Sequence, residues 1–479
     1  MKYWVNLSLC LLISAPLLAQ QAKSAPVEEL RTETLVKEIE DIVGLLIEES
    51  EPGCAISIVK EGEVLFSSGF GMSNLDFDIP NTEESIFRIA SISKHLTACC
   101  MLFLEEENKV KLDTDIREYL PEIPDYGKKI TIRHLLHHTS GLREYSSLMT
   151  LCDISEDDGW SKEEALALIL RQQGLDFWPG EKFSYCNSGY FLCSIICEKV
   201  SGKTLREYAH EKIFIPLGMK NTHFHDDSSE VVKNRSTGYS PAGKGRYQIS
   251  ETGLDMVGDG GLYTNVLDFG LWTHALLADE WKPGLLNKLL QDFNLIDGTE
   301  LDYKLGLFES TWMSQRTVSH GGAWVGYRSN LLMFPDQELS VICFSNRSNF
   351  NPARVNRQVA RLVAKNLAPS KEPTENDRPE RSEKKDSPAS YPKWDPTDYV
   401  GLYVSDELQV SWYLKSNPQL TLTGWGDKSY SIKQTGKDQL GGPRWLRLKV
   451  KRDSSGKVTA LEFGDGVPSG ILFKRHALN

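Results

Sequence analysis

The chain has 479 residues, which is more than one compact hydrophobic core usually accommodates, so we expect two domains. Its content of 40% hydrophobic and 10% aromatic residues supports globular folding. The formal net charge is −12 and no basic patch is concentrated, which argues against a nucleic-acid partner.

Residues 1–25 are typical of a secretory signal peptide. A lysine at position 2 precedes an apolar run over 7–18, and small and polar residues follow, with cleavage expected near Ala19 or Ala25. The run is shorter than the ~20 residues that span a bilayer, and no other stretch is long and apolar enough. We therefore expect an exported protein, periplasmic or secreted, without a stable membrane span.

Residues 26–368 predict an α/β (α+β) domain. Apolar spacing predicts a helix over 30–49, and two apolar runs joined by Glu61-Gly62 predict a hairpin of strands 54–60 and 64–69. Further helices are expected at 91–107, 161–173, 188–200, 204–214, 265–278 and 353–367, and strands at 303–308, 317–320, 329–334 and 339–345. This order predicts one antiparallel sheet, assembled from both ends of the segment and flanked by helices.

Residues 369–393 are rich in proline and charge and nearly free of apolar residues, which predicts a linker. Residues 394–479 show short alternating runs separated by turn signals, among them 409–414, 419–423, 445–450 and 458–463. We expect this last segment to be a small all-β domain, a barrel or a meander.

Three short motifs follow one another in the sequence: Ser91-Ile-Ser-Lys94, Tyr185-Cys-Asn187 and His320-Gly-Gly322. On a helix, a spacing of three places the Ser91 hydroxyl and the Lys94 amine on one face, where the amine can activate the serine. The same spacing recurs at Ser57/Lys60, but Ser57 lies in an expected strand, where these positions face opposite sides. The order of the motifs and their surroundings single out Ser91.

The segment Phe87-Arg-Ile-Ala-Ser-Ile-Ser-Lys94 resembles the nucleophile segment of the penicillin-recognising serine hydrolases. These include class C β-lactamases, DD-carboxypeptidases, D-aminopeptidases and related esterases. Segments 131–142, 179–190, 216–222 and 260–265 are similar to the same family, so the resemblance covers about residues 30–368. It implies a β-lactamase-like catalytic domain, followed in some relatives by a lipocalin-like β domain.

The resemblance implies a role for each residue of the first two motifs. Ser91 would be the nucleophile and Lys94 the proton relay. Tyr185 would take the proton and return it to the leaving group, and Asn187 would hold Lys94 or a substrate amide. No metal or cofactor is implied.

His320-Gly-Gly322 occupies the place where many relatives have Lys-Thr-Gly. A lysine there gives a permanent charge for a substrate carboxylate, whereas histidine, with an ordinary pKa of about 6.5, is mostly neutral at pH 7. Carboxylate recognition is then weakened, unless Arg328 or Arg143 supplies the charge. D-aminopeptidase-like and esterase-like relatives carry His-x-Gly.

The two glycines of the third motif, Gly321 and Gly322, let a strand backbone approach the substrate closely. By analogy with the family, the N–H of Ala323 would pair with the N–H of Ser91 as an oxyanion hole.

Two further groups of residues suggest a metal, but structural roles are favoured for both. His134, His137 and His138 share a helical face, yet the run lacks the glutamate of H-E-x-x-H. Cys186, Cys193 and Cys197 lack a paired C-x-x-C, so core packing is the favoured interpretation. Export permits disulfides, although the spacing predicts no pairing.

The sequence therefore predicts an exported serine hydrolase that cleaves small amides or esters through a Ser91 acyl-enzyme. D-aminoacyl or peptidoglycan-related peptides are the leading substrate class, with a small molecule or peptide as the partner. The enzymatic alternatives are a carboxylesterase and a DD-carboxypeptidase or β-lactamase. An alternative of another class is a non-catalytic sensor that binds penicillin or peptides. The oligomeric state stays open.

Overall fold

The computed structural model describes residues 31–154, 159–365 and 395–476, apart from positions 418, 425–427, 444 and 465–467. The predicted signal peptide (1–25) and linker (369–393) lie outside the described residues. Among the described helices, none is both long enough and apolar enough to cross a membrane.

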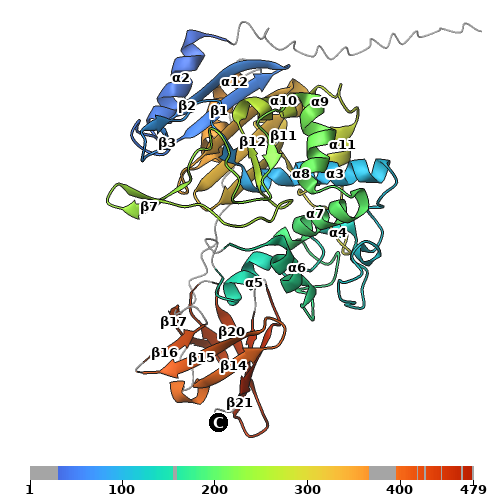
Figure 1. Ribbon diagram of the computed structural model, residues 1–479, viewed down its shortest axis with the longest axis vertical. Coiled ribbons are helices and arrows are strands. Elements are labelled where there is room, and N and C mark those ends of the chain that lie inside the picture. The colour runs from blue at the N-terminus through green and yellow to red at the C-terminus, as the bar shows by residue number, and fades with distance from the viewer. Residues whose placement is uncertain are drawn as a thin grey trace, which may run out of the picture.

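A six-stranded antiparallel sheet forms the centre of the first region, in the order β10-β11-β12-β13-β1-β2 (Figure 1). Strand β1 pairs with β13 from Cys54↔Ser345 to Lys60↔Leu339, which confirms the predicted sheet built from both ends of this segment. The strands are β1 (Cys54–Lys60), β2 (Glu63–Phe70), β10 (Phe308–Trp312), β11 (Gln315–Trp324), β12 (Tyr327–Phe334) and β13 (Leu339–Ser345).

Helices cover both faces of this sheet, because alternate side chains of each strand point to opposite sides. Cys54, Ile56 and Ile58 pack in one cluster with α2 (Glu33–Gly44) and α12 (Pro352–Lys365). Ala55 packs in a second cluster with α3 (Lys94–Glu106) and α10 (Val266–Leu277). The sheet is thus the middle layer of three.

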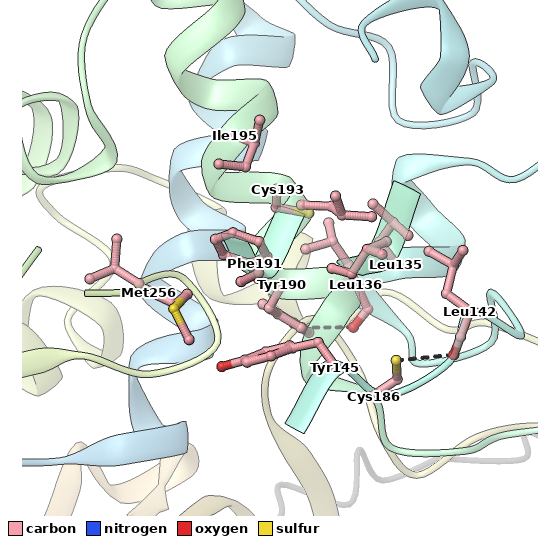
Figure 2. Packing of buried hydrophobic residues seen from close by; sticks show 14 of the residues in the cluster. Leu135, Leu136, Leu142, Tyr145, Cys186, Tyr190, Phe191, Cys193, Ile195 and Met256 are labelled. Atoms are coloured by element: carbon pink, nitrogen blue, oxygen red, sulfur yellow. Dashed lines mark hydrogen bonds between the residues drawn. The ribbon is translucent and has the colours of Figure 1, made fainter. Parts of the chain in front are cut away.

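A helical region adjoins the second face and completes the core. Figure 2 shows α4 (Ile132–Leu136) against α7 (Asn187–Ser201), where the Tyr190 hydroxyl donates to the Leu136 carbonyl at 2.7 Å. Their close approach depends on Gly189, since a Cβ there would lie 2.9 Å from the Leu135 carbonyl oxygen. The other helices are α5 (Tyr145–Leu151), α6 (Lys162–Leu170), α8 (Leu205–Ala209), α9 (Ile215–Leu217) and α11 (Leu285–Leu289), with a π-helical turn over His210–Phe214.

Short strands and turns connect these layers. The strands are β3 (Met72–Asn74), β4 (Ile79–Pro80), β5 (Phe87–Arg88), β6 (His223–Phe224), β7 (Tyr239–Gly243), β8 (Arg246–Ile249) and β9 (Leu262–Thr264). The 3-10 turns are Ala90–Ser93, Ile116–Glu118, Pro335–Gln337 and Pro396–Tyr399. In the small sheet β5-β9-β6, β9 lies between the other two strands.

The predicted strand over 303–308 is wrong. Only an isolated bridge joins Tyr303 to Phe308, and the strand of this part, β10, begins at Phe308. Gly306 has a φ of 82°, which turns the chain back over the start of α3. A Cβ at Gly306 would lie 2.5 Å from the backbone nitrogen of His95, so glycine is required there.

The C-terminal region is all-β, as predicted. Its nine strands form one antiparallel sheet in the order β17-β16-β15-β14-β22-β21-β20-β19-β18, which curls into a nearly closed barrel (Figure 1). Trp412 stacks on Phe473 at 3.9 Å in its interior. The strands are β14 (Gly401–Ser405), β15 (Val410–Ser416), β16 (Leu420–Thr423), β17 (Ser429–Ser431), β18 (Lys433–Gly436), β19 (Gln439–Gly441), β20 (Arg447–Arg452), β21 (Val458–Phe463) and β22 (Leu472–His476).

The C-terminal region packs beneath α5 and α6 through polar contacts. The buried guanidinium of Arg143 pairs with the buried Glu407 carboxylate at 2.6 Å, and Glu407 also accepts from the backbone N–H of Gln173 at 3.0 Å. The N–H of Ser469 donates to Asp176 at 2.6 Å. A pair of opposite charges shielded from water therefore joins the two regions.

Glu407→Gln should lower the free energy of unfolding by about 2 kcal/mol, because it removes the closer of the two carboxylates beside the buried Arg143 guanidinium and leaves only Asp176, whose Oδ1 lies 4.0 Å from the Arg143 Nε. Calorimetric or denaturant unfolding measures this loss. Asp406→Asn is the matched control, since the Asp406–Lys474 pair beside it is exposed and its removal should matter little. Equal stability of Glu407→Gln and the unchanged protein would contradict this assignment of the contact.

Candidate active site

Ser91 lies in the 3-10 turn Ala90–Ser93, between β5 and α3. Ala90 has a φ of 49°, in the left-handed region that non-glycine residues rarely adopt, and this makes the turn sharp. The Ser93 hydroxyl holds the turn by donating to the Ala90 carbonyl at 2.5 Å and accepting from the N–H of Leu262 at 3.2 Å. Side chains three apart eclipse in a 3-10 turn, which aligns Ser91 with Lys94.

Lys94 is fully buried, and its amine makes three short contacts. Nζ donates to the Ser91 Oγ at 3.0 Å, to the Asn187 Oδ1 at 2.8 Å and to the Asp259 carbonyl oxygen at 2.5 Å. These partners come from three segments far apart in the sequence. The amine thus has one hydroxyl and two carbonyl groups around it, and no described carboxylate forms an ion pair with it.

Asn187 begins α7 and is itself held in place. Its Nδ2 donates to the Glu144 Oε1 at 3.2 Å, and its backbone N–H donates to the Glu144 Oε2. Burial raises the pKa of Glu144, although the hydrogen bonds from Asn187 and Ser146 lower it. Glu144 therefore fixes the Asn187 amide so that its oxygen faces Lys94.

Tyr185 presents its ring, not its hydroxyl, to Lys94. Nζ lies 4.8 Å from the ring centroid. The hydroxyl oxygen is buried and has no hydrogen-bond partner among the described residues. The His138 ring packs on Tyr185 at a centroid distance of 4.1 Å, so the phenol is fixed beside the amine with its hydroxyl available.

The third motif lies on β11, which runs past the end of β10. Strand β10 pairs with β11 only as far as Ser319, so it does not cover the backbone from His320 onward. A Cβ at Gly322 would lie 2.2 Å from the Ile89 carbonyl oxygen and 2.1 Å from the Ser329 Oγ. Gly322 thus lets β11 lie directly against the segment that leads into Ser91.

His320 is buried, and burial together with the Lys94 charge lowers its pKa to about 3. Its Nδ1 is 2.5 Å from the Gly321 carbonyl oxygen, and its Nε2 is 3.5 Å from the Tyr303 hydroxyl. The imidazole is therefore neutral near pH 7 and provides no positive charge.

A cavity of about 180 Å³ opens beside Ser91. Of the predicted site residues, Ser91, Tyr185, Asn187 and Ala323 line it, whereas Lys94, His320, Gly321 and Gly322 do not. The full lining is Arg88, Ala90, Ser91, Tyr145, Tyr185, Asn187, Leu254, Met256, Asp259, Gly260, Gly261, Ala323 and Trp324.

The sequence analysis missed three polar residues of this cavity: Arg88, Tyr145 and Asp259. The Tyr145 hydroxyl donates to the Asp259 Oδ2 at 2.9 Å, and burial raises the pKa of Asp259. Arg88 was part of the quoted nucleophile segment, but nothing in its residue type or spacing set it apart. Tyr145 and Asp259 belong to no chemical motif.

The two arginines proposed to replace the missing lysine lie elsewhere. Arg143 pairs with Glu407 and donates to Gln172 at 2.9 Å. Arg328 donates to the carbonyl oxygens of Val325 and Tyr327 at 3.0 and 2.5 Å. Neither residue lines the cavity.

The three clustered histidines contact the protein itself. His134 completes a capping box with Thr131, and His137 stacks on Phe293 at 4.6 Å. His138 Nε2 contacts the Tyr303 hydroxyl at 3.0 Å. All eight cysteines of the described residues, among them Cys186, Cys193 and Cys197, carry free thiols.

The family model described as Beta-lactamase matches residues 33–365, and the chain belongs to this family of serine hydrolases. A D-aminopeptidase of Brucella anthropi is 30% identical over 299 residues, covering 62% of this chain and 56% of that protein. Penicillin-binding protein 4* of Bacillus subtilis is 28% identical over 327 residues, covering 65% and 72%. The chain thus spans about half the length of the D-aminopeptidases that it matches.

Two solved structures share the fold. The octameric penicillin-binding protein homologue from Pyrococcus abyssi has a TM-score of 0.59 at 22% identity, covering 94% of this chain and all of that one. The D-amino acid amidase from Ochrobactrum anthropi SV3 has a TM-score of 0.57 at 22% identity, covering 70% and 99%. The fold predicted from the sequence is confirmed.

Gly322→Ala should lower kcat/KM at least 100-fold, since the new methyl group would collide with the Ile89 carbonyl and move β11 away from Ser91. Gly321→Ala is the matched control: its nearest contact would be the Ser329 carbonyl oxygen at 3.8 Å, so its loss should be at least tenfold smaller. Steady-state kinetics on one chromogenic ester measures both. Equal losses would sink the steric argument.

The imidazole of His320 should not titrate between about pH 8 and 5, because its pKa lies near 3. NMR of histidine-labelled protein checks this, with the signal assigned by its loss in His320→Gln. The folded-state pKa lies below the unfolded value of about 6.5. The stability contributed by the neutral ring is therefore present above about pH 6.5 and lost as the pH falls toward 3. A midpoint near 6.5 would refute the buried neutral state.

Proposed function

We propose that this protein is an exported serine hydrolase that cleaves small amides or esters through an acyl-enzyme on Ser91. D-aminoacyl or peptidoglycan-related peptides are its leading substrate class. The observation that carries the proposal is the fully buried Lys94 amine, 3.0 Å from the Ser91 Oγ on the wall of a cavity.

Lys94 acts as the general base for Ser91. In its neutral form the amine keeps two N–H groups, which the carbonyl oxygens of Asn187 and Asp259 accept. Its lone pair then faces the Ser91 hydroxyl and takes the hydroxyl proton as Oγ forms a bond to the substrate carbonyl carbon. The two carbonyl groups orient the amine without donating a competing proton.

The negative charge that develops on the substrate oxygen is stabilised by backbone N–H groups. Ser91 and Ala323 line the same cavity, and their N–H groups form the oxyanion hole of this proposal. The bond to the leaving group breaks as that group receives a proton through Tyr185, whose ring lies beside Lys94 and whose buried hydroxyl has no partner among the described residues. Water then attacks the acyl-enzyme by the same steps in reverse.

Two observations support D-aminoacyl substrates. The neutral His320 leaves the place of the family's lysine without a charge, which disfavours the penicillin-like mode of carboxylate binding. D-aminopeptidases are among the curated relatives that match. Export rests on residues 1–25, and the divisions at 26–368, 369–393 and 394–479 stay predictions of the sequence.

Intact-protein mass spectrometry after brief exposure to a fluorophosphonate, and separately to a penicillin, tests the nucleophile. One fluorophosphonate adduct should form on the unchanged protein and none on Ser91→Ala. Ser57→Ala is the matched control, because Ser57 has the same spacing to Lys60 but lies in β1, so its adduct should persist.

The outcomes separate the alternatives. An adduct with the fluorophosphonate alone supports an aminopeptidase or esterase. A stable penicilloyl adduct favours a penicillin-binding peptidase. An adduct that survives in Ser91→Ala overturns the nucleophile, and no adduct with either probe favours a non-catalytic binding protein.

A further inference from the structure

Arg88 is a buried cation on the wall of the cavity that contains Ser91. Its exposed fraction is 5%, and no described residue accepts a hydrogen bond from its guanidinium. The Nε atom is fully buried and unpartnered. Buried polar groups are nearly always paired, and an unpaired buried charge is costly, so this group needs a function.

No carboxylate of the described residues forms an ion pair with Arg88. Its nearest aromatic contact is the Tyr263 ring, with the guanidinium carbon 5.8 Å from the ring centroid. Asp259 lies on the same cavity but forms no ion pair with Arg88 within 4.0 Å, and its Oδ2 accepts from Tyr145. Burial raises the pKa of Asp259, although the charges of Lys94 and Arg88 act to lower it.

Arg88 and Ser91 face the same small space. The cavity of about 180 Å³ is close to the ~150 Å³ of a cavity that holds a benzene-sized group. A substrate acylating Ser91 can therefore place a small side chain or terminal residue in it. An anionic group on that part of the substrate would lie in the cavity that Arg88 lines.

We propose that Arg88 binds a carboxylate on the substrate of Ser91, and that the preferred substrates are small D-aminoacyl compounds with a carboxylate on the leaving group or on the acyl side chain. The proposal rests on the proposed serine hydrolase function. A guanidinium matches a carboxylate with two parallel hydrogen bonds, which gives orientation as well as affinity. Arg88 thus supplies, from β5, the charge that the neutral His320 on β11 does not supply.

The carboxylate has two possible positions, and matched substrate pairs distinguish them. D-alanyl-D-alanine and its C-terminal amide place it on the leaving group. The α-p-nitroanilides of D-glutamate and D-glutamine place it on the acyl side chain. For one of the two pairs, kcat/KM should be at least tenfold higher for the acid than for its neutral partner.

Variants of Arg88 test the source of this preference. In Arg88→Met the acid-to-neutral ratio of kcat/KM should fall to about one, and Arg88→Lys should keep part of it. Arg328→Met is the matched control, since Arg328 does not line the cavity, and it should keep the ratio. The melting temperature of Arg88→Met should equal or exceed that of the unchanged protein, because an unpaired buried charge has been removed.

A ratio near one for both pairs in the unchanged protein would overturn the proposal. A ratio that Arg88→Met leaves intact would do so as well. A lowered melting temperature with equal losses on acid and neutral substrates would assign Arg88 a structural role instead.

Binding of these compounds to the Ser91→Ala protein tests the carboxylate site without turnover. A failure of the Arg88 proposal can then be distinguished from a failure of the serine hydrolase proposal. Calorimetry with the same four compounds should show at least tenfold tighter binding of one acid than of its neutral partner. The double variant Ser91→Ala/Arg88→Met should lose this difference in affinity. Such a difference supports the carboxylate site even if no substrate is cleaved. Equal binding of acids and neutral partners overturns it even if Ser91 forms adducts.

Discussion

The burial of the Lys94 amine is the constraint on which the site depends. An amine without water must find its hydrogen-bond partners inside the protein, and here they come from Ser91, Asn187 and Asp259. These residues lie in the turn before α3, at the start of α7 and in the loop before β9. Folding the amine into the core therefore requires three distant segments to meet at one point, and that point is beside the serine.

The contacts that hold Lys94 in place continue, through neighbouring residues, to the C-terminal region. Asn187 accepts from Lys94 and is held by Glu144, and the preceding residue, Arg143, pairs with Glu407. One short stretch of backbone thus holds the amide of the site on one side and the C-terminal barrel on the other. The segment that positions Asn187 is therefore also the segment that contacts the barrel.

Periodicity and spacing predict those parts of this structure that are set by local sequence. The sheet follows from short apolar runs joined by turn signals, and the Ser91–Lys94 pair follows from a spacing of three. The strand predicted at Tyr303–Phe308 is wrong because Tyr303, Leu305 and Leu307 alternate as in a strand, yet all three are buried in an irregular turn around Gly306. An alternating pattern of apolar residues indicates which side chains are buried, but it does not indicate whether the chain continues as a strand or turns back.

The residues of the cavity wall could not be predicted from the sequence, for a different reason. Arg88, Tyr145 and Asp259 are common residue types from separate segments, and only the packing of β5, α5 and the loop before β9 brings them together. The sequence shows that His320 replaces the family's lysine, and this replacement indicates the loss of a positive charge. The position of a compensating charge depends on which arginine lacks a partner, and pairing is a property of the fold. Arg143 and Arg328 are engaged elsewhere, which leaves Arg88 as the arginine on the cavity wall beside the serine.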